Sequence, residues 1–187
     1  MTSIQRVLKA VFSSGKSITI TVVVLAAVLL PALFLFDPML VIILMLLLVL
    51  LFVYKLYGKR VGQELVVGLL FALFITSYQN YVYSTSNYFV GKINVFPLVV
   101  WTVGLVLLRE LYERYTGPYR FLVFSVAYLA CLSLLEFVGY YFLSIQIAQE
   151  YPSLFGTGII HGPPIIHIFY LSAGPLYLLV TDYLEVK

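Results

Sequence analysis

One acidic residue, Glu136, stands alone inside a long apolar stretch, RFLVFSVAYLACLSLLEFVGYYF (120–142). It lies 16 residues beyond Arg120, which is roughly 24 Å along an α-helix. An ionised carboxylate at such a depth in a membrane is costly unless it is protonated, paired or in contact with water. Ser133 and Tyr140 are each about one helical turn away on the same face. We therefore predict a polar stripe that either serves a ligand or a proton, or bonds to a neighbouring helix.

Both histidines of the chain fall in IIHGPPIIH (159–167). His161 and His167 are six residues apart, a spacing that places them about 120° apart around a helix. Pro163 and Pro164 also prevent one continuous helix across both positions. We predict no metal site here. His167, in the first turn of the last apolar segment, is a candidate for ligand contact or proton relay, whereas His161 is expected in the preceding loop.

Further polar residues accompany apolar segments near the same predicted depth. Gln79 and Asn80 interrupt the tyrosine-rich SYQNYVYSTSNYF (77–89), and buried amides need hydrogen-bond partners. The tyrosines themselves fit an aromatic belt at the membrane interface. The dipeptide Gly174-Pro175 predicts an interruption of the last segment at about the depth of Glu136. The predicted ligand-binding set is Gln79, Asn80, Ser133, Glu136, Tyr140, His167, Tyr170 and Ser172, with Glu136 and His167 as the catalytic candidates.

The elements that must position these residues are membrane helices. Of the 187 residues, 63% are apolar and 10% are charged, against roughly 25% charged in soluble domains, and the mean hydropathy is +1.05. Apolar runs near 20 residues, without strict alternation, indicate helical spans. We predict an all-α, polytopic transmembrane helical bundle forming a single domain over residues 1–187, with spans at about 18–36, 39–57, 61–83, 96–114, 121–148 and 164–183.

The distribution of Lys and Arg gives this bundle a direction. If the N-terminus is cytoplasmic, ten of the eleven basic residues fall on the inner side and only Lys92 falls outside. Short loops obey the positive-inside rule. The sequence therefore predicts an N-in, C-in protein of the cell membrane with six spans. Proline and glycine residues predict short connections between the spans: Pro38 begins the second span and Gly117 ends a helix.

The segment RELYERY (109–115) predicts two ion pairs at the inner end of the fourth span. Arg109 and Glu113, and likewise Glu110 and Arg114, have i,i+4 spacing. Because each carboxylate has an arginine, structural anchoring is the favoured interpretation over acid–base chemistry.

No catalytic, nucleotide-binding or cysteine-based motif identifies a reaction, so enzyme activity and any cofactor are left open. The first hypothesis is a small membrane protein whose outward-leaning polar pocket binds or processes a lipophilic molecule, such as a quinone, isoprenoid or lipid. An accessory subunit of a larger, respiratory-type membrane complex is the second hypothesis, and a solute-binding transport component is the third. The expected partners are membrane lipids and, for the second hypothesis, other membrane subunits; no basic patch suggests nucleic acid.

Overall fold

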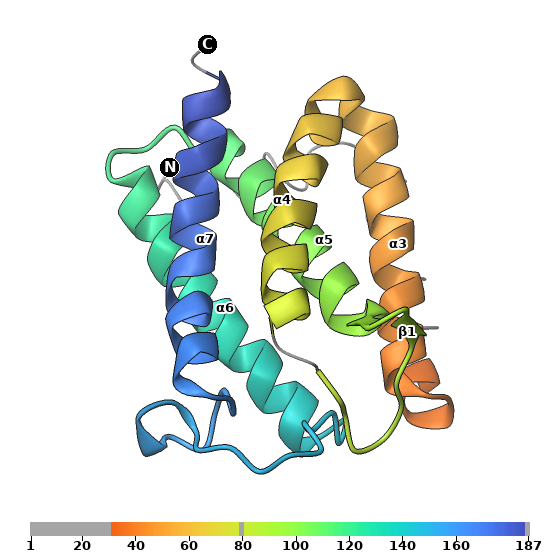
Figure 1. The fold of residues 1–187 in the computed structure, drawn as a ribbon. Helices are drawn as coiled ribbons and strands as arrows, with labels where there is room; N and C mark the ends of the chain where they lie inside the picture. Colours follow the sequence, from red (N-terminus) through yellow and green to blue (C-terminus); the bar gives the residue numbers. More distant parts are fainter. Residues whose placement is uncertain (1–30, 79–80, 186–187) are drawn as a thin grey trace.

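The computed structural model describes residues 31–78 and 81–185 as a mostly helical bundle. Five helices in this part are long and apolar enough to cross a membrane. They are α3 (Pro38–Tyr57), α4 (Lys59–Tyr78), α5 (Val95–Arg114), α6 (Arg120–Tyr141) and α7 (Pro164–Glu185). The prediction of a membrane protein built from helices is thus confirmed (Figure 1). Most of the predicted first span, 18–36, lies outside the described residues, which begin within it with a short helical piece at 31–35.

The turns follow from local chemistry. The Asp37 carboxylate caps α3 by accepting hydrogen bonds from the backbone N–H groups of Met39 (2.9 Å) and Leu40 (3.1 Å), and Pro38 opens the helix as predicted. Gly58 ends α3 with a φ of 62° and donates its N–H to the Tyr54 carbonyl. Only one residue therefore separates α3 from α4.

Two helices end earlier than the predicted spans. The predicted third span reaches residue 83, but α4 ends at Tyr78, and the predicted fifth span reaches 148, but α6 ends at Tyr141. Hydropathy did not locate these ends because apolar or aromatic residues recur at 81–83 and at 142–148. They instead form extended segments that pair with each other: residues Tyr83 and Ile147 form a β-bridge, and the Ala148 N–H donates to the Val82 carbonyl at 2.8 Å.

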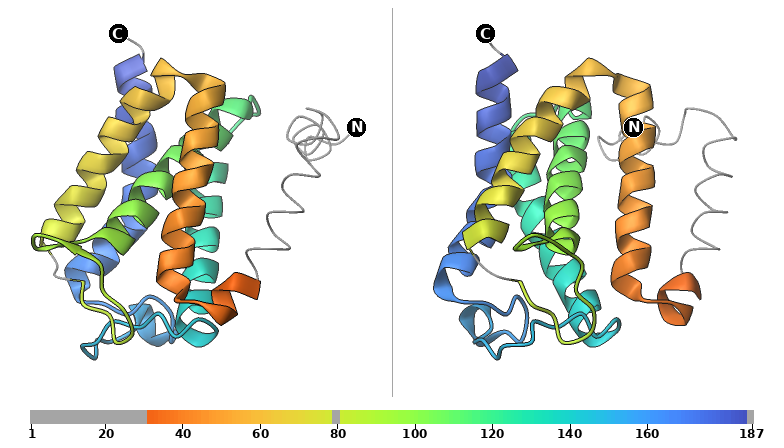
Figure 2. Two further views of the ribbon diagram at one scale, coloured as in Figure 1. Left: turned by 90° about the vertical axis from the view of Figure 1, so that its right-hand side faces the viewer. Right: turned by 45° about the vertical axis from the view of Figure 1, so that its right-hand side comes forward.

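These connections gather at one end of the bundle, here called the loop end, which carries residues 81–94 and 142–163 (Figures 1 and 2). It includes the hairpin of β1 (Phe89–Val90) and β2 (Ile93–Asn94) and the short 3-10 helix η1 (Leu154–Gly156). The opposite end, here called the arginine end, carries Arg60, Arg109, Arg114 and Arg120.

Helix α5 is the centre of the bundle. It packs against α3, α4, α6 and α7, and half of its residues are buried. Helix α6 is peripheral, with no buried residue. The main apolar cluster lies between α4, α5 and α7 and combines Ala72, Ile75, Tyr81, Trp101, Ile160, Ile166, Tyr170 and Ala173.

Helix α7 is continuous through Gly174-Pro175, so the predicted interruption is wrong. Gly174 has a packing role instead: a Cβ atom there would lie 2.6–2.7 Å from ring atoms of Tyr128. The Tyr128 hydroxyl donates to the Tyr170 carbonyl at 2.7 Å. The glycine thus lets α6 approach α7 closely at the level of Tyr170.

Candidate functional site

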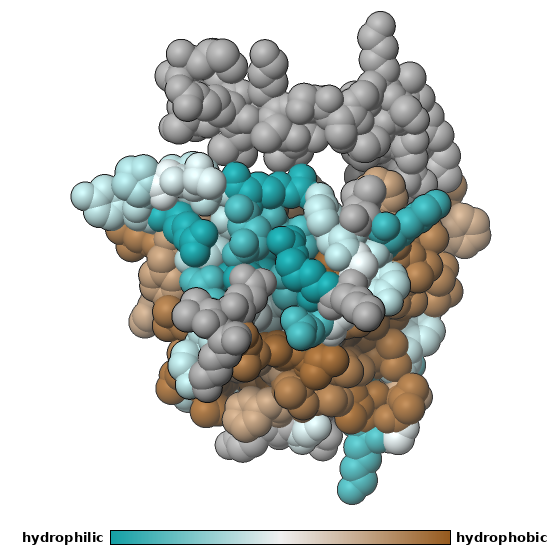
Figure 3. All heavy atoms as spheres, turned by 90° about the horizontal axis from the view of Figure 1, so that it is seen from above, coloured by the Kyte–Doolittle hydropathy of each residue, from teal (hydrophilic) through white to brown (hydrophobic). Residues whose placement is uncertain are grey.

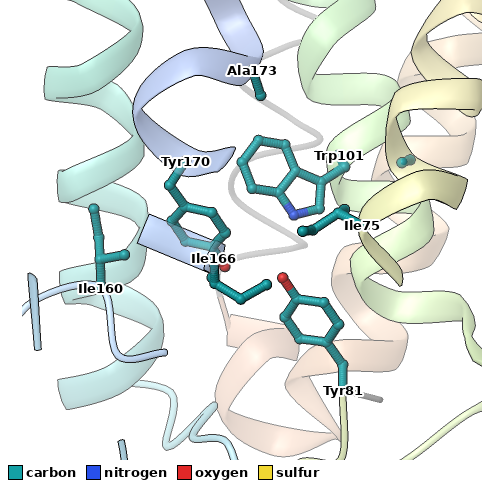
Figure 4. Close-up of a cluster of buried hydrophobic side chains, with 8 residues drawn as sticks. Ile75, Tyr81, Trp101, Ile160, Ile166, Tyr170 and Ala173 are labelled. Atoms are coloured by element: carbon teal, nitrogen blue, oxygen red, sulfur yellow. The ribbon is translucent and has the colours of Figure 1, made fainter. Parts of the chain in front are cut away.

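A cluster of polar and aromatic side chains lies toward the loop end of the bundle. Tyr170 comes from α7 and Trp101 from α5, and their rings meet edge-on with centroids 4.9 Å apart. Tyr81 follows the end of α4 and is 2% exposed. Figure 4 shows the Tyr81 hydroxyl pointing toward the Trp101 indole nitrogen and the Tyr170 hydroxyl. Three hydrogen-bonding groups from distant parts of the sequence therefore converge inside an apolar shell.

Glu136 adjoins this cluster from α6. It is half-buried, and its carboxyl group interacts with the Tyr170 hydroxyl. Together Tyr81, Trp101, Tyr170 and Glu136 are called the tyrosine cluster below. Its chemistry combines hydrogen-bond donors with one acid, and Tyr170 is placed to connect Glu136 to Tyr81.

The Tyr81 hydroxyl is the unusual member of the tyrosine cluster. Although it lies beside Trp101 and Tyr170, it completes no hydrogen bond of ordinary geometry within the described part of the chain. Burial raises the pKa of Tyr81 well above its ordinary value, so the phenol stays neutral and keeps its proton as a donor. A buried hydroxyl without a partner costs about 1–3 kcal/mol.

The backbone around Tyr81 is firmly fixed. The side chain of Asn94, which is 2% exposed, donates from Nδ2 to the Tyr81 carbonyl at 2.9 Å, while its Oδ1 caps α5 by accepting from the Phe96 N–H. Tyr83 stacks on Tyr81 at an interplanar angle of 22°. The position of the unpaired hydroxyl is thus set by the start of α5 and not by a mobile side chain.

An apolar groove runs between α4 and α7 beside this cluster. Its volume is about 420 Å³, and it is lined by Leu70, Phe71, Phe74, Ile75, Ile165, Ile168, Phe169, Ser172 and Leu176. Two lining residues also contact the cluster: Ile75 belongs to the same buried core as Tyr81, and the Phe169 ring lies 4.9 Å from that of Trp101. The groove is open at the surface, where Phe74 is 66% and Ile168 62% exposed.

Both histidines make contacts within the loop end. The His161 ring stacks on Tyr140 at 4.3 Å with an interplanar angle of 16°. Burial, and then the nearby His167, lower the pKa of His161, which favours its neutral form. His167 Nε2 lies 3.1 Å from the Ile160 carbonyl oxygen. Across residues 31–78 and 81–185, no group of three or more His, Cys, Asp or Glu side chains is arranged to hold a metal ion.

The predicted site residues are thus distributed unevenly. Glu136 and Tyr170 come together, whereas Tyr140 and His167 contact the loop 142–163 and its surroundings. Ser172 lines the groove and donates to the Ile168 carbonyl of its own helix at 2.8 Å. Ser133 is half-buried on α6. Gln79 and Asn80 lie outside the described residues.

Sequence reasoning missed Trp101 and the role of Tyr81. Trp101 is the only tryptophan of the chain and sits in the interior of an apolar run, which was a usable signal because a buried indole N–H usually finds a hydrogen-bond partner. Tyr81 was grouped with an interfacial aromatic belt, and nothing in its local sequence separates it from its neighbours.

A second polar cluster lies at the arginine end, where Figure 3 shows hydrophilic side chains surrounded by apolar ones. The fully buried Arg109 bonds Asp182 at 2.5 Å and Glu113 at 2.8 Å, so the predicted pair with Glu113 is confirmed. The predicted pair of Glu110 with Arg114 is wrong.

Glu110 bonds Arg60 of α4 at 2.8 Å, and Arg114 instead contacts Tyr57 at the end of α3. Glu110 is 3% exposed, and Arg60 reaches its carboxylate from the neighbouring helix α4. These ion pairs tie α4, α5 and α7 together.

Comparisons with protein-family models, curated proteins and solved structures return no match for this chain.

Proposed function

We propose that this protein binds a lipophilic molecule, with an apolar tail in the groove between α4 and α7 and a polar head directed to the tyrosine cluster. The observation that carries the proposal is the shared wall: Ile75 and Phe169 line the groove and pack against the cluster on their other side. A molecule that displaces these two side chains slightly would reach the polar atoms without crossing a water phase.

The groove and the tyrosine cluster contribute differently to binding, because the surrounding solvent is the lipid bilayer. Inside a bilayer an acyl chain gains little by leaving other chains for an apolar groove, since both surroundings are equally apolar. Preference for one molecule must therefore come from the polar atoms behind the groove. Hydrogen bonds there are made in a low-dielectric environment, where an unmade bond is expensive.

We propose further that the chain crosses the cell membrane six times with both ends inside. The asymmetry of Lys and Arg supports this orientation, because Arg60, Arg109, Arg114 and Arg120 share one end of the described bundle. The loop end then faces outward, and the ligand enters sideways from the outer leaflet.

A second candidate is an accessory subunit of a membrane complex. Helix α6 supports it, because none of its residues is buried although it carries Glu136. A partner helix on this face would shield the acid from lipid.

The experiment is purification of the full chain in mild detergent, followed by mass spectrometry of bound small molecules and proteins. Ser172→Phe fills the groove, and Val126→Phe is the matched control at a 59%-exposed position on α6. We expect one lipophilic species to be enriched over the membrane extract with the wild-type and Val126→Phe chains and lost with Ser172→Phe. Equal retention in both variants contradicts the groove, and a stoichiometric protein partner without a bound lipid supports the second candidate.

A further inference from the structure

The tyrosine cluster restricts the head group that the proposed ligand can carry. The Tyr81 hydroxyl is buried, completes no hydrogen bond of ordinary geometry among the described residues and points toward Trp101 and Tyr170. The indole N–H of Trp101 can only donate, and the neutral Tyr81 phenol has a proton to donate. A complementary head group therefore presents a hydrogen-bond-accepting oxygen.

The charged residues near the tyrosine cluster restrict the head group further. Within residues 31–78 and 81–185, the arginines are at the opposite end of the bundle, and Lys92 is exposed on the hairpin between β1 and β2. The ionisable group at the cluster is an acid, Glu136. A phosphate or carboxylate head buried here would have no Lys or Arg of the described residues beside it to neutralise its charge, so the accepting oxygen belongs to an uncharged group.

The surrounding rings indicate the shape of that group. Trp101 meets Phe169 and Tyr170 edge-on, each with centroids 4.9 Å apart, and Phe169 also lines the groove. Aromatic walls of this kind favour a flat, conjugated ring, through stacked or edge-on contacts worth about 0.5–1.5 kcal/mol each beyond burial.

We propose that the head group is a quinone, whose carbonyl oxygen accepts hydrogen bonds from the Tyr81 hydroxyl and the Trp101 N–H. This inference rests on the proposed function and names its ligand class. Tyr170 lies between the bound quinone carbonyl and Glu136. No electron or group transfer is part of the proposal. The tail of the quinone occupies the groove between α4 and α7.

Trp101 supplies the assay because it is the only tryptophan of the chain. The full chain in detergent is titrated with a short-tailed ubiquinone, and quenching of Trp101 fluorescence is recorded. The bound quinone is then competed with an alkylbenzene of equal tail length, which lacks oxygen, and with phosphatidylglycerol. We expect saturable quenching by the quinone, with both competitors binding at least tenfold more weakly than the quinone.

Tyr81→Phe removes only the donating hydroxyl and keeps the ring. The loss of one neutral hydrogen bond, about 1–1.5 kcal/mol, corresponds to roughly five- to tenfold weaker binding. Tyr141→Phe is the matched control. The Tyr141 hydroxyl lies away from the tyrosine cluster and donates to the Gly158 carbonyl at 3.0 Å, so this variant should keep the quinone affinity within twofold. Unchanged thermal unfolding of Tyr81→Phe confirms that the variant is folded.

The outcomes separate this inference from the proposed function. If the alkylbenzene competes as well as the quinone, or Tyr81→Phe binds like Tyr141→Phe, the quinone assignment is overturned and a tail-binding groove remains. If phosphatidylglycerol competes best, the head group is a lipid phosphate and the assignment is also overturned. If no compound gives saturable quenching or competition, both the quinone and the groove are wrong.

Discussion

Replacing Gly174 by alanine tests the contact that holds α6 against α7. The added Cβ would lie 2.6–2.7 Å from Cγ, Cδ1 and Cδ2 of Tyr128. These atoms are at the root of the ring and cannot swing aside without moving the whole side chain. Overpacking of this kind costs about 1–3 kcal/mol, whereas alanine gains about 1 kcal/mol over glycine in helix propensity. The net expectation is destabilisation by about 0–2 kcal/mol.

The control is Gly104→Ala in the middle of α5, where a Cβ meets no atom within 4 Å. Only the propensity gain applies there, so this variant should be stabilised by up to about 1 kcal/mol. The two glycine substitutions should therefore differ by about 1–3 kcal/mol, or several degrees in the midpoint of thermal unfolding at about 2–4 °C per kcal/mol.

A double-mutant cycle isolates the clash. In a Tyr128→Ala background the obstructing ring is gone, so Gly174→Ala should stabilise the chain as Gly104→Ala does. The coupling energy should be about 1–3 kcal/mol, measured by thermal unfolding of each purified variant in one detergent. If Gly174→Ala stabilises the otherwise unaltered chain as much as Gly104→Ala, the close approach of α6 and α7 is refuted.

Three further predictions address the two ends of the bundle. Asp182→Asn should destabilise the chain by about 1.5–3 kcal/mol in thermal unfolding, because Arg109 is fully buried and loses the charge of its Asp182 partner; no effect would show that the pair is dispensable. Burial opposes the charge of Asp37, but hydrogen bonds from Ser86 and from the first turn of α3 outweigh it and lower the Asp37 pKa below 3.8. Stability from these bonds should be complete above pH 3.8 and lost as the pH falls through the lower, folded pKa, a dependence that Asp37→Asn should abolish. A cysteine at Gly156 should react with an impermeant maleimide added to intact cells and one at Gly58 should not; the reverse pattern would invert the orientation.

The helices could be predicted from sequence because each depends on a local property. An apolar run of sufficient length must be helical in lipid, and the Asp37-Pro38 cap and the Gly58 turn act through neighbouring residues. The ends of α4 and α6 were misplaced for the same reason. Residues 81–83 and 142–148 are mostly apolar or aromatic, and their pairing with each other becomes visible only in the folded chain.

The contacts between helices could not be predicted in the same way. Glu110 has an arginine at the ideal i,i+4 position but pairs with Arg60, 50 residues away, because the packing of α4 against α5 brings Arg60 to the buried Glu110 carboxylate. Gly174 looked like a helix break, yet its role is to accept the Tyr128 ring from another helix. For both Glu110 and Gly174, the residue that each one contacts is determined by how the helices pack.

The two polar clusters also differ in how completely their groups are satisfied. At the arginine end, Glu110 leaves one carboxylate oxygen without a partner among the described residues, but its other oxygen bonds Arg60, so the charge is neutralised. The Tyr81 hydroxyl has a single oxygen, and that oxygen completes no hydrogen bond of ordinary geometry among the described residues, although Asn94 bonds the backbone carbonyl of Tyr81. Among the described residues, the buried Arg109 and Glu110 have charged partners, whereas the Tyr81 phenol lacks a complete hydrogen bond that a ligand could supply. This contrast, more than the presence of an acid in the membrane, directs attention to Tyr81 as the group to test.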